Sequence, residues 1–386
     1  MPFKFASTIM TKKVLQFVYF SSCLLFKVNE NKVTFASYRS ERLSGNLLYL
    51  SEEMNRTYPD KKYVYLLRRL RGGIWGKLAY FTHLIKATYH LATSAKFIID
   101  DFYIPVYFIK PRKGTEVIQL WHAAGIFKKF GLSTVGKPFG PSPEYLKHVR
   151  VHSNYSRLYV SSSEVIPYYS EAFGMDENRI FPLGLPRTDY FFRSYQGTLA
   201  DRFYSHYPDL KGKKLILYAP TYRGRSHYQG AFKCPIDFNM LEEKLGNEYA
   251  VLIHLHPYMK VPDMSDHHFV YHFLNDYDIQ ELMYLADVLV TDYSSVIFDF
   301  SLLEKPMAFF AHDLDEYARE RDFYLDYKNM VPGPVFDRTE ALAEWIKRNE
   351  YSMDTIKRFQ ERFFDYRDGR ASERIVQHIL SEEISG

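Results

Sequence analysis

Short apolar runs alternate with longer amphipathic stretches along most of this chain, and this alternation restricts its fold more than any other feature. Strands of a parallel sheet are buried on both faces and read as continuous apolar runs, and each is joined to the next by a crossover helix. The pattern therefore predicts repeated βα units. In the first half of the chain the apolar runs are 33–36, 63–67, 97–99, 117–120, 158–160 and 180–183.

A second set of apolar runs begins after the polar segment 211–214, which indicates a second domain. These runs are 215–219, 250–255, 269–271, 288–290 and 307–310, and Asp278 is expected to cap a helix between two of them. A chain of 386 residues suits two domains better than one ordinary core. We expect an amino-terminal helix in 1–30, Rossmann-like domains in 31–200 and 201–350, and carboxyl-terminal helices in 351–386.

Four polar clusters follow directly after apolar runs. In open α/β sheets the ligand crevice lies at the carboxyl ends of the strands, so the four clusters are expected to line one cleft. They contain His122 after the run 117–120, Thr221 and Arg223 after 215–219, His254 and His256 at the end of 250–255, and Thr291, Asp292, Ser294 and Ser295 after 288–290.

The cluster at 291–295 leads from an apolar run into a helix. Free backbone N–H groups and the helix dipole make such a helix start a site for phosphate, which predicts a cradle for a nucleotide. The alternative is that Ser294 only caps the helix, as serine often does. Asp292 and Asp299 are open to three interpretations: ordering of the loop, binding of a ribose hydroxyl, or binding of Mg²⁺.

These clusters carry a resemblance to a known family. The chain has Trp-His-Ala-Ala-Gly at 121–125, Tyr-Ala-Pro-Thr-Tyr-Arg at 218–223, a His-Pro pair at 256–257, Thr-Asp-Tyr-Ser-Ser at 291–295 and Pro-Gly-Pro at 332–334. In order and spacing, from about 115 to 375, this set resembles the CDP-glycerol glycerophosphotransferase family of teichoic acid synthesis. The resemblance implies two Rossmann-like domains of the GT-B type, with the active site in the interdomain cleft and the last helix crossing back to the first domain.

One position departs from the family pattern. Family members usually have glycine after the arginine that corresponds to Arg321, and this chain has Asp322 there.

Phosphoryl transfer to a hydroxyl needs a base and groups that stabilise charge on the phosphoryl oxygens. An unperturbed histidine pKa near 6.5 allows His122 to accept a proton at neutral pH, although a histidine beside tryptophan is more often structural. The resemblance favours the catalytic interpretation for His122 and assigns His256 to the transferred phosphate. The residues expected to hold the donor are Arg223, Thr221, Thr291, Asp292, Ser294, Ser295, Arg187 and Lys128.

We expect no resident metal or cofactor. The chain has no Asp-x-Asp pair of the kind that metal-dependent glycosyltransferases carry, so Mg²⁺ is possible but not indicated. Its two cysteines, Cys23 and Cys234, have neither zinc-site nor CxxC spacing, which fits a reducing cytoplasm.

The charge is distributed unevenly along the chain. Residues 1–150 contain 24 Lys and Arg against 9 Asp and Glu, whereas 151–386 contain 26 against 37. Basic side chains interleaved with aromatic runs suit an anionic membrane surface better than nucleic acid, for which no motif is present. The apolar segment 14–26 is too short to span a bilayer, and it is interpreted either as an interfacial helix or as a packing helix.

The expected function is transfer of glycerol phosphate from CDP-glycerol to a hydroxyl of a lipid-linked, prenyl-diphosphate disaccharide acceptor, with release of CMP. This reaction would belong to wall teichoic acid synthesis at the cytoplasmic face of the membrane, with the protein bound peripherally. Two alternatives remain open. One is a polymerase that adds glycerol or ribitol phosphate, and the other is a GT-B glycosyltransferase that uses a nucleotide sugar.

Overall fold

The structure is a computed structural model that describes residues 5–381 except 139, 194–195, 222–233, 256–258, 260–267 and 274–275. Two compact units divide the chain. Unit 1 comprises Met1–Ala124, Lys129–Asp189 and Phe364–Gly386, and unit 2 comprises Gly125–Lys128 and Tyr190–Phe363. The domain border expected at residue 200 lies inside helix α7 (Gln196–His206), which belongs to unit 2.

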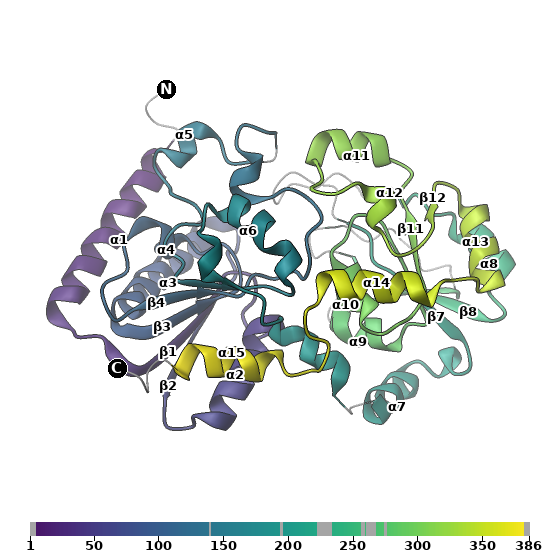
Figure 1. Ribbon diagram of the computed structural model, residues 1–386, viewed down its shortest axis with the longest axis horizontal. Helices are drawn as coiled ribbons and strands as arrows, with labels where there is room; N and C mark the ends of the chain where they lie inside the picture. Colours follow the sequence, from purple (N-terminus) through teal and green to yellow (C-terminus); the bar gives the residue numbers. More distant parts are fainter. Residues whose placement is uncertain are drawn as a thin grey trace. The chain divides into compact units, whose positions relative to one another are not determined.

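Unit 1 is built on a parallel six-stranded sheet in the order β2-β1-β3-β4-β5-β6 (Figure 1). Each predicted apolar run of the first half became a strand. The strands are β1 (Asn29–Ser37), β2 (Lys62–Leu67), β3 (Ser94–Ile99), β4 (Glu116–Gln119), β5 (Arg157–Tyr159) and β6 (Ile180–Phe181). The α/β prediction is confirmed for this unit.

The helices of unit 1 cover both faces of its sheet. They are α1 (Ala6–Leu25), α2 (Gly45–Thr57), α3 (Gly73–Thr93), α4 (Ile104–Phe108), α5 (Pro143–Leu146), α6 (Ile166–Phe173) and α15 (Ala371–Leu380). On one face, α2 and α15 pack side by side through Leu50, Met54, Ile375 and Ile379. The carboxyl-terminal helix α15 therefore completes the core of the unit that contains the amino terminus.

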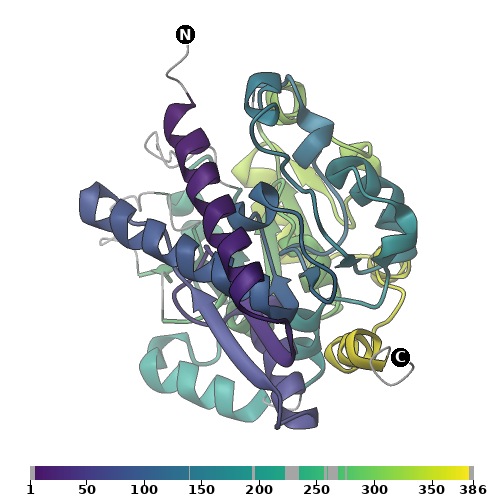
Figure 2. The same cartoon turned by 90° about the vertical axis from the view of Figure 1, so that its left-hand side faces the viewer.

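Helices α1 and α3 lie against each other on the opposite face, as Figure 2 shows. The inner side of α1 is anchored by Tyr19, whose hydroxyl accepts the backbone N–H of Arg112 at 2.7 Å, and by Gln16, which donates to the carbonyl of Phe108 at 3.0 Å. Residues 14–25 of the apolar segment are thus part of a helix that packs within unit 1. Among the described helices, none combines the length and the apolar character that crossing a bilayer requires.

Unit 2 repeats the architecture with a parallel six-stranded sheet in the order β12-β11-β10-β7-β8-β9. Its strands are β7 (Lys214–Tyr218), β8 (Tyr249–Ile253), β9 (Val270–His272), β10 (Val288–Thr291), β11 (Met307–Phe310) and β12 (Val335–Phe336). The first five match the predicted runs, and the two-residue strand β12 is an addition.

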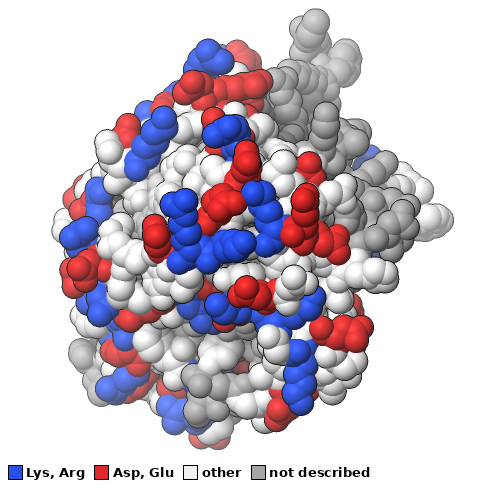
Figure 3. Space-filling model, turned by 90° about the vertical axis from the view of Figure 1, so that its right-hand side faces the viewer, with Lys and Arg blue, Asp and Glu red and all other residues white. Residues whose placement is uncertain are grey.

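The helices of unit 2 are α7, α8 (Phe238–Leu245), α9 (Ile279–Leu285), α10 (Val296–Ser301), α11 (Leu314–Arg321), α12 (Tyr327–Met330), α13 (Thr339–Arg348) and α14 (Met353–Phe363). Asp278 caps α9 as predicted, in a capping box with Glu281. One face of the sheet packs on α8 and α13 through Leu241, Leu342 and Ile346. The outer surface on that side carries acidic and basic side chains intermixed, including the pair Lys244 and Glu344 at 2.8 Å (Figure 3).

Each sheet has one point where the strand order reverses. In unit 1 the chain passes from β1 outward to β2 and then returns to β3, β4, β5 and β6 on the other side, so the reversal lies between β1 and β3. In unit 2 it lies between β7 and β10. Ligands of open α/β sheets bind at the carboxyl ends of the strands at such points, so a binding site is expected at each of these two points.

Candidate functional site

At the reversal point of unit 1, charged side chains follow both strands. Arg39 comes two residues after β1, and Asp100 and Asp101 come directly after β3. The Nη1 atom of Arg39 donates to Oδ2 of Asp101 at 2.6 Å. His122, which follows the neighbouring strand β4, places its Nδ1 atom 3.2 Å from the same oxygen.

The side chain of His122 is partly exposed to solvent. Its side chain is 33% exposed, whereas that of Asp101 is only 7% exposed. Burial lowers the pKa of His122, the cations Arg39 and Arg187 act in the same direction, and Asp101 opposes them. A lowered pKa keeps the imidazole neutral at neutral pH, which is the form that accepts a proton.

The pKa values of the two carboxyl groups at this strand end are shifted in opposite directions. Burial acts to raise the pKa of Asp101, but His122 and Arg39 outweigh it and hold that pKa well below its usual range. Burial and the neighbouring Asp101 raise the pKa of Asp100 to about 7. Asp101 is therefore the ionised partner of the histidine.

The backbone that carries His122 has an unusual conformation. Trp121 has φ 53°, which side chains with a Cβ rarely adopt and which costs about 1–2 kcal/mol. Its N–H donates to Oε1 of Gln119 at 2.8 Å, and its carbonyl accepts from Nδ2 of Asn46 at 2.9 Å. Its indole ring stacks on Phe130 with 5.3 Å between ring centroids. These contacts fix the turn despite the strain.

Arg187 joins the same cluster. Its Nη1 atom donates to the carbonyl of His122 at 2.7 Å, and its backbone N–H donates to Oδ1 of Asn46 at 3.0 Å. The neighbouring Asp189 accepts the backbone N–H groups of Ala371 and Ser372 at the start of α15, both at 2.8 Å. In unit 1 the structure thus brings together His122 and Arg187, both predicted site residues.

At the reversal point of unit 2, the loops after β7 and β10 are bonded to each other. The Oγ1 atom of Thr291 donates to the carbonyl of Ala219 at 2.6 Å, and Oδ1 of Asp292 accepts the N–H of Thr221 at 2.8 Å. That carboxylate also accepts the N–H of Tyr293 at 2.6 Å. Asp292 therefore orders this loop, which is one of the three interpretations that its position allowed.

Ser294 and Ser295 lie between this loop and α10. Ser295 is the residue before the helix, and Oγ of Ser294 lies 3.4 Å from the N–H of Val296.

Lys128 belongs to the segment 125–128 of unit 2, where its Nζ atom lies 3.4 Å from the hydroxyl of Tyr317. Arg223 and His256 lie outside the described residues. His254 is described and half-buried, and burial lowers its pKa to about 4.

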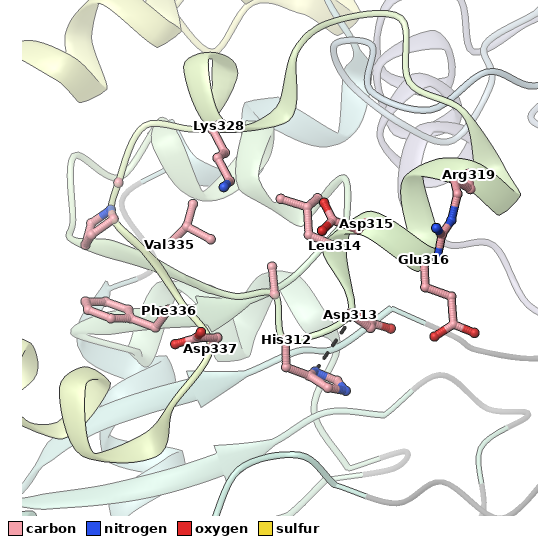
Figure 4. A pocket seen from close by; sticks show the side chains of 13 residues that line it. His312, Asp313, Leu314, Asp315, Glu316, Arg319, Lys328, Val335, Phe336 and Asp337 are labelled. Carbon is pink, nitrogen blue, oxygen red and sulfur yellow. Dashed lines mark ion pairs between the residues drawn. The ribbon is translucent and has the colours of Figure 1, made fainter.

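A polar hollow of about 750 Å³ lies beside the same loop, between α11, α12 and β12 (Figure 4). The hydroxyl of Tyr293 donates to Oδ1 of Asp313 in its wall at 2.9 Å, and the hydroxyl of Tyr327, next to the lining residue Lys328, donates to the carbonyl of Asp292 at 3.1 Å. The charged lining residues are Asp313, Asp315, Glu316, Arg319, Lys328 and Asp337, and His312 lines the hollow with them. Among the described residues, no group of three or more His, Cys, Asp or Glu side chains is arranged to hold a metal ion.

Sequence reasoning missed Arg39, Asn46 and Asp101 as members of the site. The signal for the two charged residues was present, because Asp101 follows the predicted run 97–99 and Arg39 follows 33–36. Only the strand order, however, shows that these two runs are neighbours at the reversal point.

The departure at Asp322 also has a structural context. Asp322 has φ 60° and ψ 138° at the end of α11, a backbone conformation in which glycine is favoured. The family's usual glycine fits this position without strain.

Comparisons with known proteins agree with these observations. The chain is 43% identical to the teichoic acid ribitol-phosphate primase of Bacillus spizizenii over 98% of both chains, and 32% identical to the teichoic acid glycerol-phosphate primase of Bacillus subtilis over 77% of this chain and 76% of that one. The solved structure of the wall teichoic acid polymerase TagF matches 99% of this chain and 96% of its own, with a TM-score of 0.79 and 24% identity. It supports the two-domain fold of the GT-B type.

The family model for CDP-glycerol:poly(glycerophosphate) glycerophosphotransferases matches residues 17–381. This chain therefore belongs to that family of teichoic acid phosphotransferases.

Proposed function

We propose that this enzyme transfers a polyol phosphate from a CDP-polyol to a hydroxyl group of a lipid-linked saccharide acceptor and releases CMP. The observation that carries this proposal is the pairing of His122 with Asp101 at the reversal point of unit 1, because it supplies a neutral, partly exposed base at the place where ligands of such sheets bind. The hydroxyl-rich loop 291–295 at the corresponding point of unit 2 supplies donors for a diphosphate.

In the proposed reaction, Nε2 of His122 takes the proton of the acceptor hydroxyl while that oxygen attacks the β-phosphorus of the donor. A bond forms between the acceptor oxygen and the β-phosphorus, and the bond from that phosphorus to the bridging oxygen breaks, so CMP leaves with the electron pair. We assign Thr221, Thr291, Asp292, Ser294, Ser295, Arg187 and Lys128 to donor binding, together with Arg223, and we assign His256 to the transferred phosphate. Positive charge and N–H groups there would stabilise the charge that develops on the phosphoryl oxygens.

Ribitol phosphate is the first candidate for the transferred group. The ribitol-phosphate primase is 43% identical to this chain, and the glycerol-phosphate primase is 32% identical. Glycerol phosphate is the second candidate, because the matching family model is described by glycerophosphate transfer and a TagF variant has been solved after a soak with CDPG. A primase acting on a prenyl-diphosphate disaccharide would fit either candidate.

The donor is decided by direct competition. The purified protein is incubated with CDP-ribitol, CDP-glycerol and a UDP-sugar in equal amounts, with a lipid-linked disaccharide that does or does not carry one glycerol phosphate. Mass spectrometry of the lipid product then gives the mass added. Addition of ribitol phosphate supports the first candidate, addition of glycerol phosphate supports the second, and transfer of a sugar alone would establish the glycosyltransferase alternative instead.

The base is tested with His122→Ala and with His83→Gln as a matched control. His83 is another histidine of unit 1, is buried, and bonds to the hydroxyl of Tyr103 at 3.0 Å. We expect His122→Ala to lower turnover about 10²- to 10⁴-fold with donor affinity unchanged, the usual effect of losing a general base. A His122→Ala variant that keeps more than a tenth of the wild-type turnover would reject the assignment.

We also propose that unit 1 attaches peripherally to an anionic membrane, at its cytoplasmic face. Phe17, Phe20 and Leu24 lie one helical turn apart on α1 and are 72%, 69% and 77% exposed. On the neighbouring helix α3, Trp75 is 79% exposed and Ile74 is 75% exposed. Apolar side chains beside a strongly basic segment suit insertion into an anionic lipid interface.

Vesicle flotation tests this attachment. The protein should float with phosphatidylglycerol vesicles at low salt, less at high salt, and hardly at all with phosphatidylcholine. Phe17→Ser with Phe20→Ser and Leu24→Ser should weaken flotation at all salt concentrations, whereas Arg68→Glu with Arg69→Glu should weaken only the part that depends on salt. Equal flotation of the wild type and the serine variant would contradict the role of α1.

A further inference from the structure

Asp101 is placed unlike an ordinary surface carboxylate. It follows β3 at the reversal point of unit 1, its side chain is 7% exposed, and both of its oxygens are engaged. The Oδ1 atom accepts the backbone N–H of Phe102 at 2.5 Å, and the Oδ2 atom accepts from Nη1 of Arg39 at 2.6 Å. The same Oδ2 atom lies 3.2 Å from Nδ1 of His122. The carboxylate thus joins a fixed backbone and a fixed cation to one particular nitrogen of the imidazole.

We propose that Asp101 is a positioning residue for the reaction: it holds His122 in the tautomer that carries its proton on Nδ1, so that Nε2 has its lone pair directed to the acceptor hydroxyl. This inference rests on the proposed role of His122 as the base. The partner of one imidazole nitrogen determines which nitrogen carries the proton, and a carboxylate accepts but does not donate. A carboxylate facing Nδ1 therefore selects the tautomer that a base acting through Nε2 requires.

A purely structural role would be to hold the strand end and the turn together, but other groups already do so. The carbonyl of His122 is bonded to Arg187, and the carbonyl of Trp121 is bonded to Asn46. The N–H of Trp121 is bonded to Gln119. Because the backbone on both sides of the imidazole is fixed without Asp101, the contact between Asp101 and His122 acts on the ring itself, through its rotamer and its tautomer.

Arg39 completes the arrangement. Its guanidinium neutralises the carboxylate in the buried strand end, so Asp101 stays ionised while its Oδ2 atom lies 3.2 Å from Nδ1 of the imidazole. When His122 gains a proton, the same carboxylate stabilises the imidazolium. The charged groups that act on the ring are Arg39 from the end of β1, Asp101 from the end of β3, and Arg187 from the loop after β6. Asp100 adjoins Asp101 but does not act on the ring.

The test compares Asp101→Asn with Asp100→Asn, a matched change at the adjacent residue. Asparagine at 101 keeps the shape of the side chain but offers an amide that can donate to Nδ1, which favours the opposite tautomer. We expect kcat to fall about 10²- to 10⁴-fold in Asp101→Asn with the donor Kd unchanged. Asp101→Glu, which keeps the charge, should recover at least about tenfold of that loss, and Asp100→Asn should stay within about threefold of the wild type.

Two further readouts separate positioning from folding. The acid limb of the kcat/KM profile should move to lower pH in Asp101→Asn, because the imidazolium loses its carboxylate. Nitrogen-15 NMR of histidine-labelled wild-type protein at pH 8 should show His122, assigned by its absence in His122→Ala, with the proton on Nδ1. The opposite tautomer in the wild type would overturn the inference without any need for the Asp101 variants to fold.

The outcomes also separate this inference from the proposed function. If His122→Ala loses activity while Asp101→Asn keeps more than a tenth of it, the base assignment stands and the positioning role is wrong. If His122→Ala itself keeps more than a tenth, the base assignment fails, and the inference fails with it.

Discussion

Gly125, in the Trp-His-Ala-Ala-Gly segment, is expected to be intolerant of any side chain. It has φ 61°, and a Cβ atom built there would lie 2.1 Å from Cε1 and 2.2 Å from Cδ1 of Phe298. Phe298 is fully buried in unit 2, where its ring stacks on Phe359 at 5.2 Å and meets Phe363 edge-on at 4.9 Å. The ring cannot yield without disturbing the contact between α10 and α14.

The cost of Gly125→Ala has two parts that a control can separate. The left-handed backbone costs an alanine about 1–2 kcal/mol, and overpacking of a tight core costs about 1–3 kcal/mol more, so the sum is about 2–5 kcal/mol. Gly212, in the same unit, has φ 88° and nothing within 4 Å of its Cβ position, so Gly212→Ala carries only the first part. The difference between the two variants measures the clash with the ring.

Native-state hydrogen exchange of peptides from α10 and α14 reports on this unit alone. Their opening free energies should fall by about 2–5 kcal/mol in Gly125→Ala and by about 1–2 kcal/mol in Gly212→Ala. Turnover should fall in Gly125→Ala as well, because His122 is only three residues away. If the two variants lose equal amounts of stability, Phe298 does not restrict this position and the packing argument is refuted.

Three other changes test separate features. Asp322→Gly should raise the unfolding free energy of unit 2 by about 1 kcal/mol, because the relief of backbone strain at φ 60° exceeds the extra conformational entropy that a glycine loses on folding. Asp322→Ala, which keeps the strain, is the control in thermal unfolding. Asp189→Ala should cost about 1–3 kcal/mol and speed exchange in α15, whose first two N–H groups lose their acceptor; equal exchange in the two proteins would contradict this. Burial lowers the pKa of His152 to about 4, so folding favours its neutral form. The stability that this group contributes is therefore full above about pH 6.5 and falls by up to about 3 kcal/mol as the pH drops to 4. Urea unfolding of His152→Gln should show a flatter dependence of stability on pH over that range.

The strands were predictable because burial on both faces leaves an unbroken apolar signal. Each of the eleven predicted runs corresponds to a strand, and the strand at 97–99 is longer than predicted, at Ser94–Ile99. The strand β12 was not predicted because its two residues, Val335 and Phe336, are too few to give such a signal. The order of the strands was also hidden, since periodicity describes one element and the order depends on contacts between distant ones.

The same distinction explains the site. His122, Thr291 and Asp292 could be predicted because each follows a run that is visible in the sequence. Asn46 could not, because it lies in helix α2 and reaches the turn only after α2 has packed on the sheet, where it donates to Trp121 and accepts from Arg187. Residues that serve a site from a helix have no strand-end signature, so the three-dimensional arrangement is the only place where their role is visible.

Strained backbone conformations occur beside residues of the proposed site. Trp121 occupies a left-handed conformation next to the proposed base, and Asp322 occupies another strained one beside Phe323, which pairs with Lys128 in an isolated bridge. Strain of this kind persists only where surrounding contacts over-determine the backbone, and Trp121 has such contacts in Gln119, Asn46 and Phe130. With an unstrained extended residue at 121, the chain would leave β4 in a straight line, and the following imidazole would not turn toward Asp101. The conformation of Trp121 therefore directs His122, and the Asp101 carboxylate then sets its tautomer.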